Sequence, residues 1–183
     1  MDQSKKEFAI YLCSMALIKS VRGNHPRFGE NCWFAENATI VGDVTMGQDC
    51  TVWFNAVIRG DVNAITIGDR TNIQDGAVIH CTYQRFKTTI GSSVSIAHNA
   101  VVHGCTLEDS VLVGMGAIVM DGAVVGTGSI IAAGAIVTQH TIVPPGSIYA
   151  GNPARFLKAV SLEQADIFDR TADNYVMYAK WFK

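Results

Sequence analysis

The chain has 183 residues, of which 16% are charged and 49% hydrophobic, and its net charge is −2. A mean hydropathy of +0.21 and 17 glycines indicate a dense folded body and exclude a disordered chain. The small net charge provides no basic field, so neither nucleic acid nor an anionic membrane surface is an expected partner. The sequence contains no apolar run of the roughly 18 residues that a membrane-spanning helix needs. Five cysteines without scaffold spacing favour a reducing, cytoplasmic compartment.

A six-residue period organises the chain between residues 25 and 155. Large apolar residues recur at every sixth position, and a small or β-branched residue follows each of them by four positions. Such a pattern is typical of three short strands per turn, stacked into a triangular prism with about 18 residues per coil. A β-sandwich would need hairpin turns and gives no fixed period. The sequence therefore predicts an all-β, parallel β-helix, in which the apolar series run from Phe28 to Ile58, Ile67 to Ile79, Ile90 to Val102 and Leu107 to Tyr149.

The repeat also divides the chain. Residues 1–14 carry no repeat and are interpreted as an N-terminal extension, unstructured or a non-native start, without an assigned function. Residues 15–155 form the β-helix domain. From residue 156 to residue 183 the apolar period becomes helical, and Ser161 with Gln164 forms a capping box. We expect a C-terminal α-helix packed on the β-helix.

Three of the five histidines are distinguished by their place in the repeat. His80 and His103 each follow an apolar anchor by one position, and they lie one coil apart once the five extra residues before Ile90 are subtracted. Stacked strands about 4.8 Å apart place two imidazoles where both can bind one metal. His98 belongs to a different face, roughly 15 Å or more away along the chain. We therefore expect the third ligand to come from a neighbouring subunit, in a head-to-tail contact that closes most simply as a homotrimer.

The same count places polar residues on two complementary strips. Arg59 lies beneath the first histidine of the stacked pair, whereas Gln74 and Asp75 lie on the other face, with Asp75 beneath His98. Asp75 is placed to accept a charge-assisted hydrogen bond from Arg59 across the subunit interface. Asp61, two residues after Arg59, is expected to orient that arginine or its partner loop.

Three neutral imidazoles with an open position are typical of a catalytic metal site, because structural zinc sites are normally closed by four protein ligands. A divalent metal lowers the pKa of bound water toward 7, so hydroxide becomes available to attack a small electrophilic carbon. Zn²⁺ is the expected metal, with Fe²⁺ or Co²⁺ as alternatives, because affinity order alone does not choose among them.

The scaffold resembles the left-handed parallel β-helix of the hexapeptide-repeat superfamily, and the handedness comes from that resemblance. On this scaffold, the site residues resemble the gamma-class carbonic anhydrase family. The matching motifs are Arg59-Gly60-Asp61, Asn72-Ile73-Gln74-Asp75, His80 and the spacing from His98 to His103.

This resemblance implies a homotrimeric lyase that reversibly hydrates CO2 to bicarbonate by a metal-bound hydroxide, with interfacial sites made of His80, His98 and His103. It implies that Gln74 hydrogen-bonds the hydroxide and that Arg59, Asp61 and Asp75 support the site and the interface. Asn72 is expected to help position the substrate. Tyr178 resembles a tyrosine that bacterial members bring near the site.

The chain departs from the family in its acidic residues. Archaeal members carry acids just after the Arg-Gly-Asp turn and in the loop after the first histidine, where they relay protons. Here Val62 and Asn63 follow the turn, and no acid occurs from Cys81 to Thr89. The missing proton shuttle argues against fast hydration.

Three alternative functions stay open. Hexapeptide-repeat acyltransferases use acetyl-CoA, and the segments Val143–Gly146 and Gly151–Ala154 resemble their last coils. Such enzymes usually rely on a single catalytic histidine, which leaves the stacked pair unexplained. An acyl-CoA thioesterase would use the same metal hydroxide on a thioester. A metal-binding assembly trimer would show little hydration activity.

Overall fold

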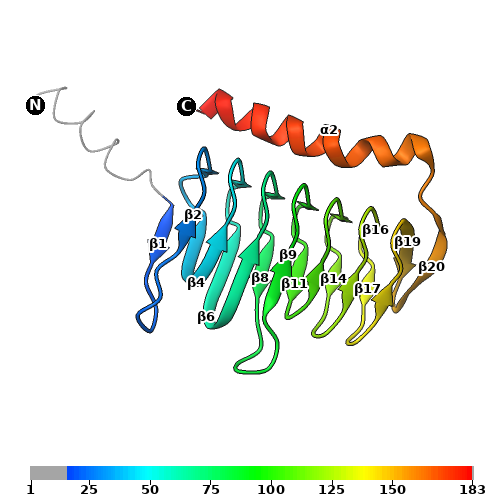
Figure 1. The fold of residues 1–183 in the computed structure, drawn as a ribbon, viewed down its shortest axis with the longest axis horizontal. Helices are drawn as coiled ribbons and strands as arrows, with labels where there is room; N and C mark the ends of the chain where they lie inside the picture. Colours follow the sequence, from blue (N-terminus) through cyan, green and yellow to red (C-terminus); the bar gives the residue numbers. More distant parts are fainter. Residues whose placement is uncertain (1–15, 183) are drawn as a thin grey trace, which may run out of the picture.

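The computed structural model describes residues 16–182, which form a triangular solenoid of parallel strands with one long helix along its side (Figure 1). The predicted left-handed parallel β-helix with a C-terminal α-helix is confirmed. The predicted N-terminal extension, residues 1–14, lies outside the described residues. Within the described range, no helix has both the length and the apolar character needed to cross a membrane.

The prism has three faces, and two of them share one hydrogen-bonded sheet because β6 turns a corner and pairs with β8 on one side and β9 on the other. The first face holds β1 (Leu17–Lys19), the first halves of β4 (Thr39–Met46) and β6 (Val57–Ile67), β8 (Val78–His80), β11 (Val101–His103), β14 (Ile118–Val119) and β17 (Ile136–Val137). The second face holds β2 (Arg27–Phe28), the second halves of β4 and β6, β9 (Thr88–Ile90), β12 (Thr106–Leu107), β15 (Val124–Val125) and β18 (Ile142–Val143). The third holds β3 (Trp33–Phe34), β5 (Thr51–Val52), β7 (Asn72–Ile73), β10 (Ser95–Ile96), β13 (Leu112–Val113), β16 (Ile130–Ile131) and β19 (Ser147–Gly151).

The core consists of aliphatic columns that run along the prism axis. In one column Ile58 pairs with Ile79, Ile79 with Val102, and Val102 with Val119, and all four side chains are fully buried. These pairs cross the places where the sequence spacing departs from six, so the predicted register is confirmed there. Extra residues therefore leave the ladder as loops and do not shift it.

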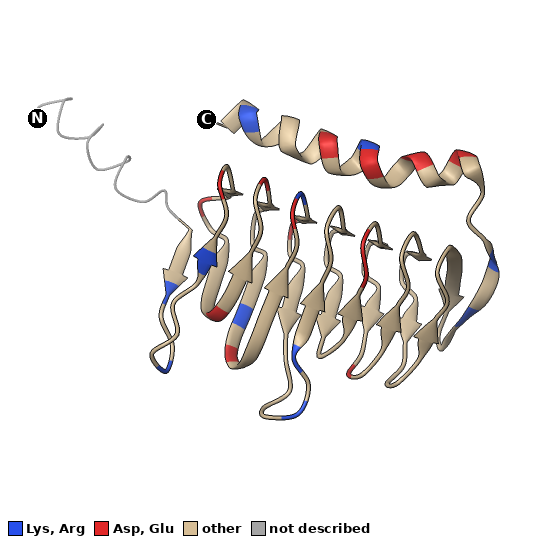
Figure 2. Ribbon diagram, in the orientation of Figure 1, with Lys and Arg blue, Asp and Glu red and all other residues tan. Residues whose placement is uncertain are grey.

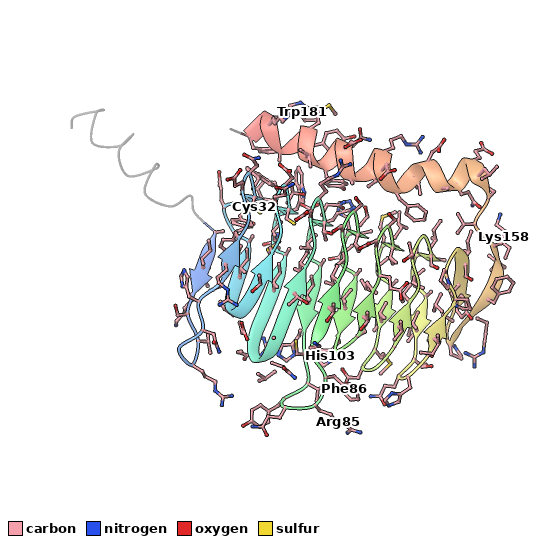
Figure 3. The ribbon with its side chains drawn as sticks, in the orientation of Figure 1. Cys32, Arg85, Phe86, His103, Lys158 and Trp181 are labelled. Carbon is pink, nitrogen blue, oxygen red and sulfur yellow. The ribbon has the colours of Figure 1, made fainter. Side chains whose placement is uncertain are left out.

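The largest such excursion is the segment between β8 and β9. Thr82 and Phe86 close its base by an isolated antiparallel bridge, and the loop protrudes from one corner of the prism (Figures 1 and 3). Its charged residues, Arg85 and Lys87, are both basic (Figure 2). The loop therefore presents positive charge beside the corner from which it departs.

The C-terminal segment differs from the expectation that residues 156–183 are helical throughout. Residues Ala154–Ala159 form β20, which pairs antiparallel with β19 and covers the last edge of the third face. Helix α2 (Leu162–Ala179) begins after the capping box of Ser161 and Gln164, which is formed. The helix then runs back along the prism and packs on β5 and β10, burying Phe168, Ala172 and Ala179 (Figure 1). A short 3-10 turn, Lys180–Phe182, follows.

The inward and outward positions of the repeat should differ sharply in their effect on stability. Ile131 is 0% exposed, whereas Ile142, also on a two-residue strand, is 62% exposed. We expect Ile131→Ala to lower the free energy of unfolding by about 2–5 kcal/mol, because it opens a cavity in the column. Ile142→Ala is the matched control and should cost less than about 1 kcal/mol. Urea-induced unfolding of the two variants measures this difference, and equal losses would contradict the assignment of faces.

Candidate metal centre

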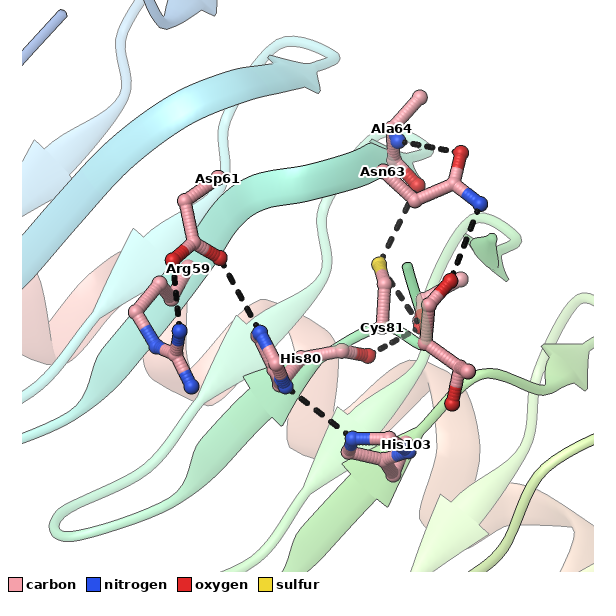
Figure 4. A network of polar contacts seen from close by, with 9 residues as sticks. Arg59, Asp61, Asn63, Ala64, His80, Cys81 and His103 are labelled. Atoms are coloured by element: carbon pink, nitrogen blue, oxygen red, sulfur yellow. Dashed lines mark hydrogen bonds and ion pairs between the residues drawn. The ribbon is translucent and has the colours of Figure 1, made fainter. Parts of the chain in front are cut away.

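Two histidines face each other at one corner of the prism. His80 ends β8 and His103 ends β11, and the two residues pair in register, as the sequence predicts. The Nδ1 atom of His80 lies 3.1 Å from the Nε2 atom of His103 (Figure 4). Two imidazole nitrogens bound to one tetrahedral metal at about 2.0–2.1 Å would be roughly 3.3 Å apart. The pair therefore has the spacing of two ligands of one ion.

Carboxylates hold the outer nitrogens of both rings. The Nε2 atom of His80 lies 3.1 Å from Asp61 Oδ1, and the Nδ1 atom of His103 lies 2.6 Å from Asp121 Oδ1. A carboxylate on the outer nitrogen fixes the tautomer and leaves a lone pair on the inner nitrogen. The two inner nitrogens are thus the ones prepared for a cation.

The Arg-Gly-Asp turn positions Asp61. Gly60 approaches the backbone of Asp43 so closely that a Cβ atom would collide with it, which keeps the turn tight. Arg59 donates a hydrogen bond to Asp61 Oδ2 at 2.6 Å. Although burial alone would raise the pKa of Asp61, hydrogen bonds from Arg59 and His80 hold it below its usual value. Burial lowers the pKa of His80, which favours the neutral, ligating form of that imidazole.

His98 occupies a separate site. It follows β10 on the third face, and its Nδ1 atom lies 2.9 Å from Asp75 Oδ2. It lines a recess with Trp181, which belongs to the 3-10 turn after α2 and lies on the opposite side of the prism from His103 (Figure 3). Across residues 16–182, no three histidine, cysteine or acidic side chains converge closely enough to hold a metal. One chain therefore presents two facing imidazoles at one place and a third imidazole at another.

The predicted contact between Arg59 and Asp75 is not made within one chain. Arg59 bonds its neighbour Asp61, and Asp75 bonds His98, so the two predicted strips lie apart. Both side chains are substantially exposed, which leaves them accessible to a second subunit.

A buried amide chain holds Gln74. Its Nε2 atom donates to Asn72 Oδ1 at 2.9 Å, and Asn72 Nδ2 donates to Ser95 Oγ at 2.8 Å. All three residues are buried on the third face, one coil or less from His98. The bond to Asn72 fixes the orientation of the Gln74 amide, and with it the direction of the acceptor atom Oε1. Ser95 is outside the predicted set, although its pairing with Asn72 follows from the same register.

The C-terminal helix forms a largely apolar recess of about 300 Å³ beside His98. It brings Tyr178 into the same recess as His98 and Asp75, next to Tyr175. Burial, with smaller effects of Asp75 and Tyr178, raises the pKa of Tyr175 to about 12. The sequence places Tyr175 in the apolar stripe of the helix and interprets it as packing. The remaining walls are Trp53, Phe54, Trp181 and Phe182.

Asp121 is the carboxylate that the sequence analysis misses. The one-residue contraction at Leu107 puts Met120, not Asp121, directly after the anchor that stacks on Val102. Asp121 therefore does not stack on His103 in the strand register. Its side chain still reaches the His103 ring, because it lies at the corner that follows β14. The signal is in the spacing: Asp121 lies within one residue of the position that is one coil beyond His103.

The chain is similar to known proteins over most of its length. Residues 25–60 and 104–139 match the family model described as bacterial transferase hexapeptide (six repeats). The chain is 54% identical over 147 residues to a probable carbonic anhydrase of Methanocaldococcus jannaschii, covering 80% of this chain and 92% of that protein. It is 38% identical to the mitochondrial gamma carbonic anhydrase 1 of Arabidopsis thaliana over 94% of this chain, but spans only 65% of that protein's length.

A solved structure has the same fold. The hexapeptide transferase family protein of Anaplasma phagocytophilum superposes with a TM-score of 0.87 and 38% identity. The match covers 91% of this chain and 98% of that chain.

The amide chain predicts a stability difference between two asparagines. Asn72 is 1% exposed and joins Gln74 to Ser95, so Asn72→Ala leaves buried polar atoms unpaired. We expect a loss of about 1–3 kcal/mol in the free energy of unfolding. Asn37, which bonds Asn55 on the exposed surface, is the control, and Asn37→Ala should cost less than about 1 kcal/mol. Urea-induced unfolding checks both values, and a loss no larger for Asn72 than for Asn37 would contradict the buried chain.

Proposed function

The chain belongs to the gamma carbonic anhydrase-like family of hexapeptide-repeat proteins, and from this premise we propose that it is a homotrimeric, metal-dependent lyase that reversibly hydrates CO2. One observation carries the proposal. The Nδ1 atom of His80 lies 3.1 Å from the Nε2 atom of His103, whereas His98 lies on another face of the same prism. A complete three-histidine site then needs two copies of the chain. The carbonic anhydrase names of the archaeal and plant relatives support the reaction.

A threefold ring satisfies this requirement. In it, His80 and His103 of one subunit meet His98 of the next, and the same head-to-tail contact repeats around the axis. Arg59 and Asp75 lie on the two surfaces that would meet, with opposite charges and partial exposure. An ion pair between them would fix the register of the subunits more than it would add affinity.

The donor set fits Zn²⁺, with Fe²⁺ or Co²⁺ as alternatives, because all three suit neutral imidazole. When bound, such an ion supplies a nucleophile near neutral pH by lowering the pKa of a water molecule. Asp61, on the outer nitrogen of His80, would keep that ring in the ligating tautomer.

The buried amide chain would orient the reacting oxygen. The hydrogen bond from Gln74 Nε2 to Asn72 fixes the amide of Gln74, so its Oε1 atom would accept a hydrogen bond from the attacking O–H group and orient that oxygen toward the CO2 carbon. Tyr178 and Tyr175 close the apolar side of the recess, which suits an uncharged substrate.

Proton export is the expected slow step. Val62 packs against the core and Asn63 donates to the Thr82 carbonyl, and neither side chain has a group that ionises, so neither can carry a proton away. The adjoining loop carries no carboxylate from Cys81 to Thr89. A mobile buffer base then takes the role that an acidic side chain would otherwise have.

Hydrolysis of an acyl thioester such as an acyl-CoA is the second candidate, and the aromatic recess is the observation that favours it. Its volume of about 300 Å³ exceeds what CO2 requires and suits a short acyl group. The transferase name of the solved relative keeps acyl transfer as a further alternative, and a metal-binding trimer without hydration activity is the last. The cytoplasmic location stays a prediction, since the plant relative is named as mitochondrial.

Hydration is tested by stopped flow on the zinc protein and on the anaerobically prepared iron protein. We expect a metal-dependent rate that rises with the concentration of imidazole buffer, because the chain lacks a shuttle. His98→Ala should remove at least about 99% of this rate, since a ligand is lost. His140→Ala, which changes a histidine outside the site, is the control and should retain the rate. Full metal occupancy without hydration would reject the proposal and move the assignment to thioester hydrolysis or to an assembly role.

The shared site is tested by mixing two inactive variants. His98→Ala keeps the facing pair, and His103→Ala keeps His98. In randomly mixed trimers, about one interface in four joins an intact pair to an intact His98, so coexpression should restore about a quarter of the wild-type rate. Sedimentation velocity checks that each variant is a trimer. If the site lay within one chain, mixing would restore nothing.

A further inference from the structure

Asp121 occupies the corner that follows β14 and bonds two separate elements. Its Oδ1 atom lies 2.6 Å from His103 Nδ1, and its Oδ2 atom accepts from the Thr82 hydroxyl at 2.8 Å. The side chain is 14% exposed. One carboxylate thus joins the second facing histidine to the base of the protruding loop.

The surroundings are shaped to admit this carboxylate. Residue 104 is a glycine with φ +56°, and a Cβ atom there would collide with Asp121 Oδ1. Among the described residues, no lysine or arginine lies within ion-pair distance of Asp121, so the imidazole and the hydroxyl are its hydrogen-bond partners. The hydrogen bonds from His103 and Thr82 offset the cost of burying the charge.

We propose that Asp121 is a positioning residue that holds His103 as its Nδ1–H tautomer, aims Nε2 at the metal position, and fastens the loop base through Thr82. This inference rests on the proposed metal function. It adds Asp121, which bonds the nitrogen of His103 that points away from the metal position. Asp61 stands in the same relation to His80, so the facing pair is held from both ends. A carboxylate behind a ligating histidine typically changes metal affinity by about 10–100-fold.

The test measures Zn²⁺ affinity of the full-length protein by competition with a chromophoric chelator at pH 7.5. Asp121→Ala should weaken zinc binding by about 10–100-fold. Asp121→Asn should weaken it less, because its amide oxygen still accepts from His103. Thr82→Val, which frees only the loop base, should change affinity by less than about threefold. The matched control is Asp109→Asn, a corner aspartate that accepts the Ser92 N–H group and touches no histidine.

A second readout separates positioning from a purely structural role. In metal-free protein, ¹⁵N chemical shifts of the His103 ring report which nitrogen carries the proton. We expect the Nδ1–H form in the wild type and in Asp121→Asn, and a mixture of tautomers in Asp121→Ala. The tautomer of the wild type keeps the test decisive if the alanine variant does not fold.

Two results would overturn the inference: a zinc affinity of Asp121→Ala equal to that of Asp109→Asn, or an Nε2–H tautomer of His103 in the wild type. Failure of the proposed function has a different signature. If the wild type binds zinc and Asp121 variants change affinity and tautomer as expected, but CO2 is not hydrated, the positioning role stands and the hydration assignment fails.

Discussion

The parallel hydrogen-bonded ladder between successive coils is the constraint on which the rest of the structure depends. Each short strand is too small to be stable alone, and it is held by the strand one coil before and one coil after it. The buried column from Ile58 through Ile79 and Val102 to Val119 keeps this register even where the chain inserts or deletes residues. A residue one position after a column member is therefore fixed as firmly as the core itself, which is how His80 and His103 come to face each other.

The same constraint explains which features the sequence predicts. A strict period fixes the coil, and a count of extra residues fixes the stacking of His103 on His80 and the approach of Asp75 to His98. The prediction fails where the period no longer applies. Asp121 is displaced by the contraction at Leu107, and β20 follows the last complete coil, where it pairs with a free edge before the helical stripe begins at Leu162.

Residues on α2 could not be placed by counting. The helical stripe contains Tyr175, but it does not say which face of the prism that residue meets, and Tyr178 lies outside the stripe. That contact is decided by tertiary packing: Tyr175 against Trp53, and Phe182 against Trp33 and Trp53. Sequence periodicity thus describes this helix alone, whereas the position of Tyr178 beside His98 depends on aromatic contacts between distant segments.

The loop between β8 and β9 shows how the fold separates two tasks. Its extra residues leave the ladder at a corner and return to it in register, so its tip is free of the spacing that fixes His80 and His103. Beyond Thr82, the tip can change in length or charge without moving an imidazole. In the proposed site, proton transfer and metal binding therefore depend on different segments of the chain: an acidic tip can be grafted onto the loop while His80 and His103 keep their positions.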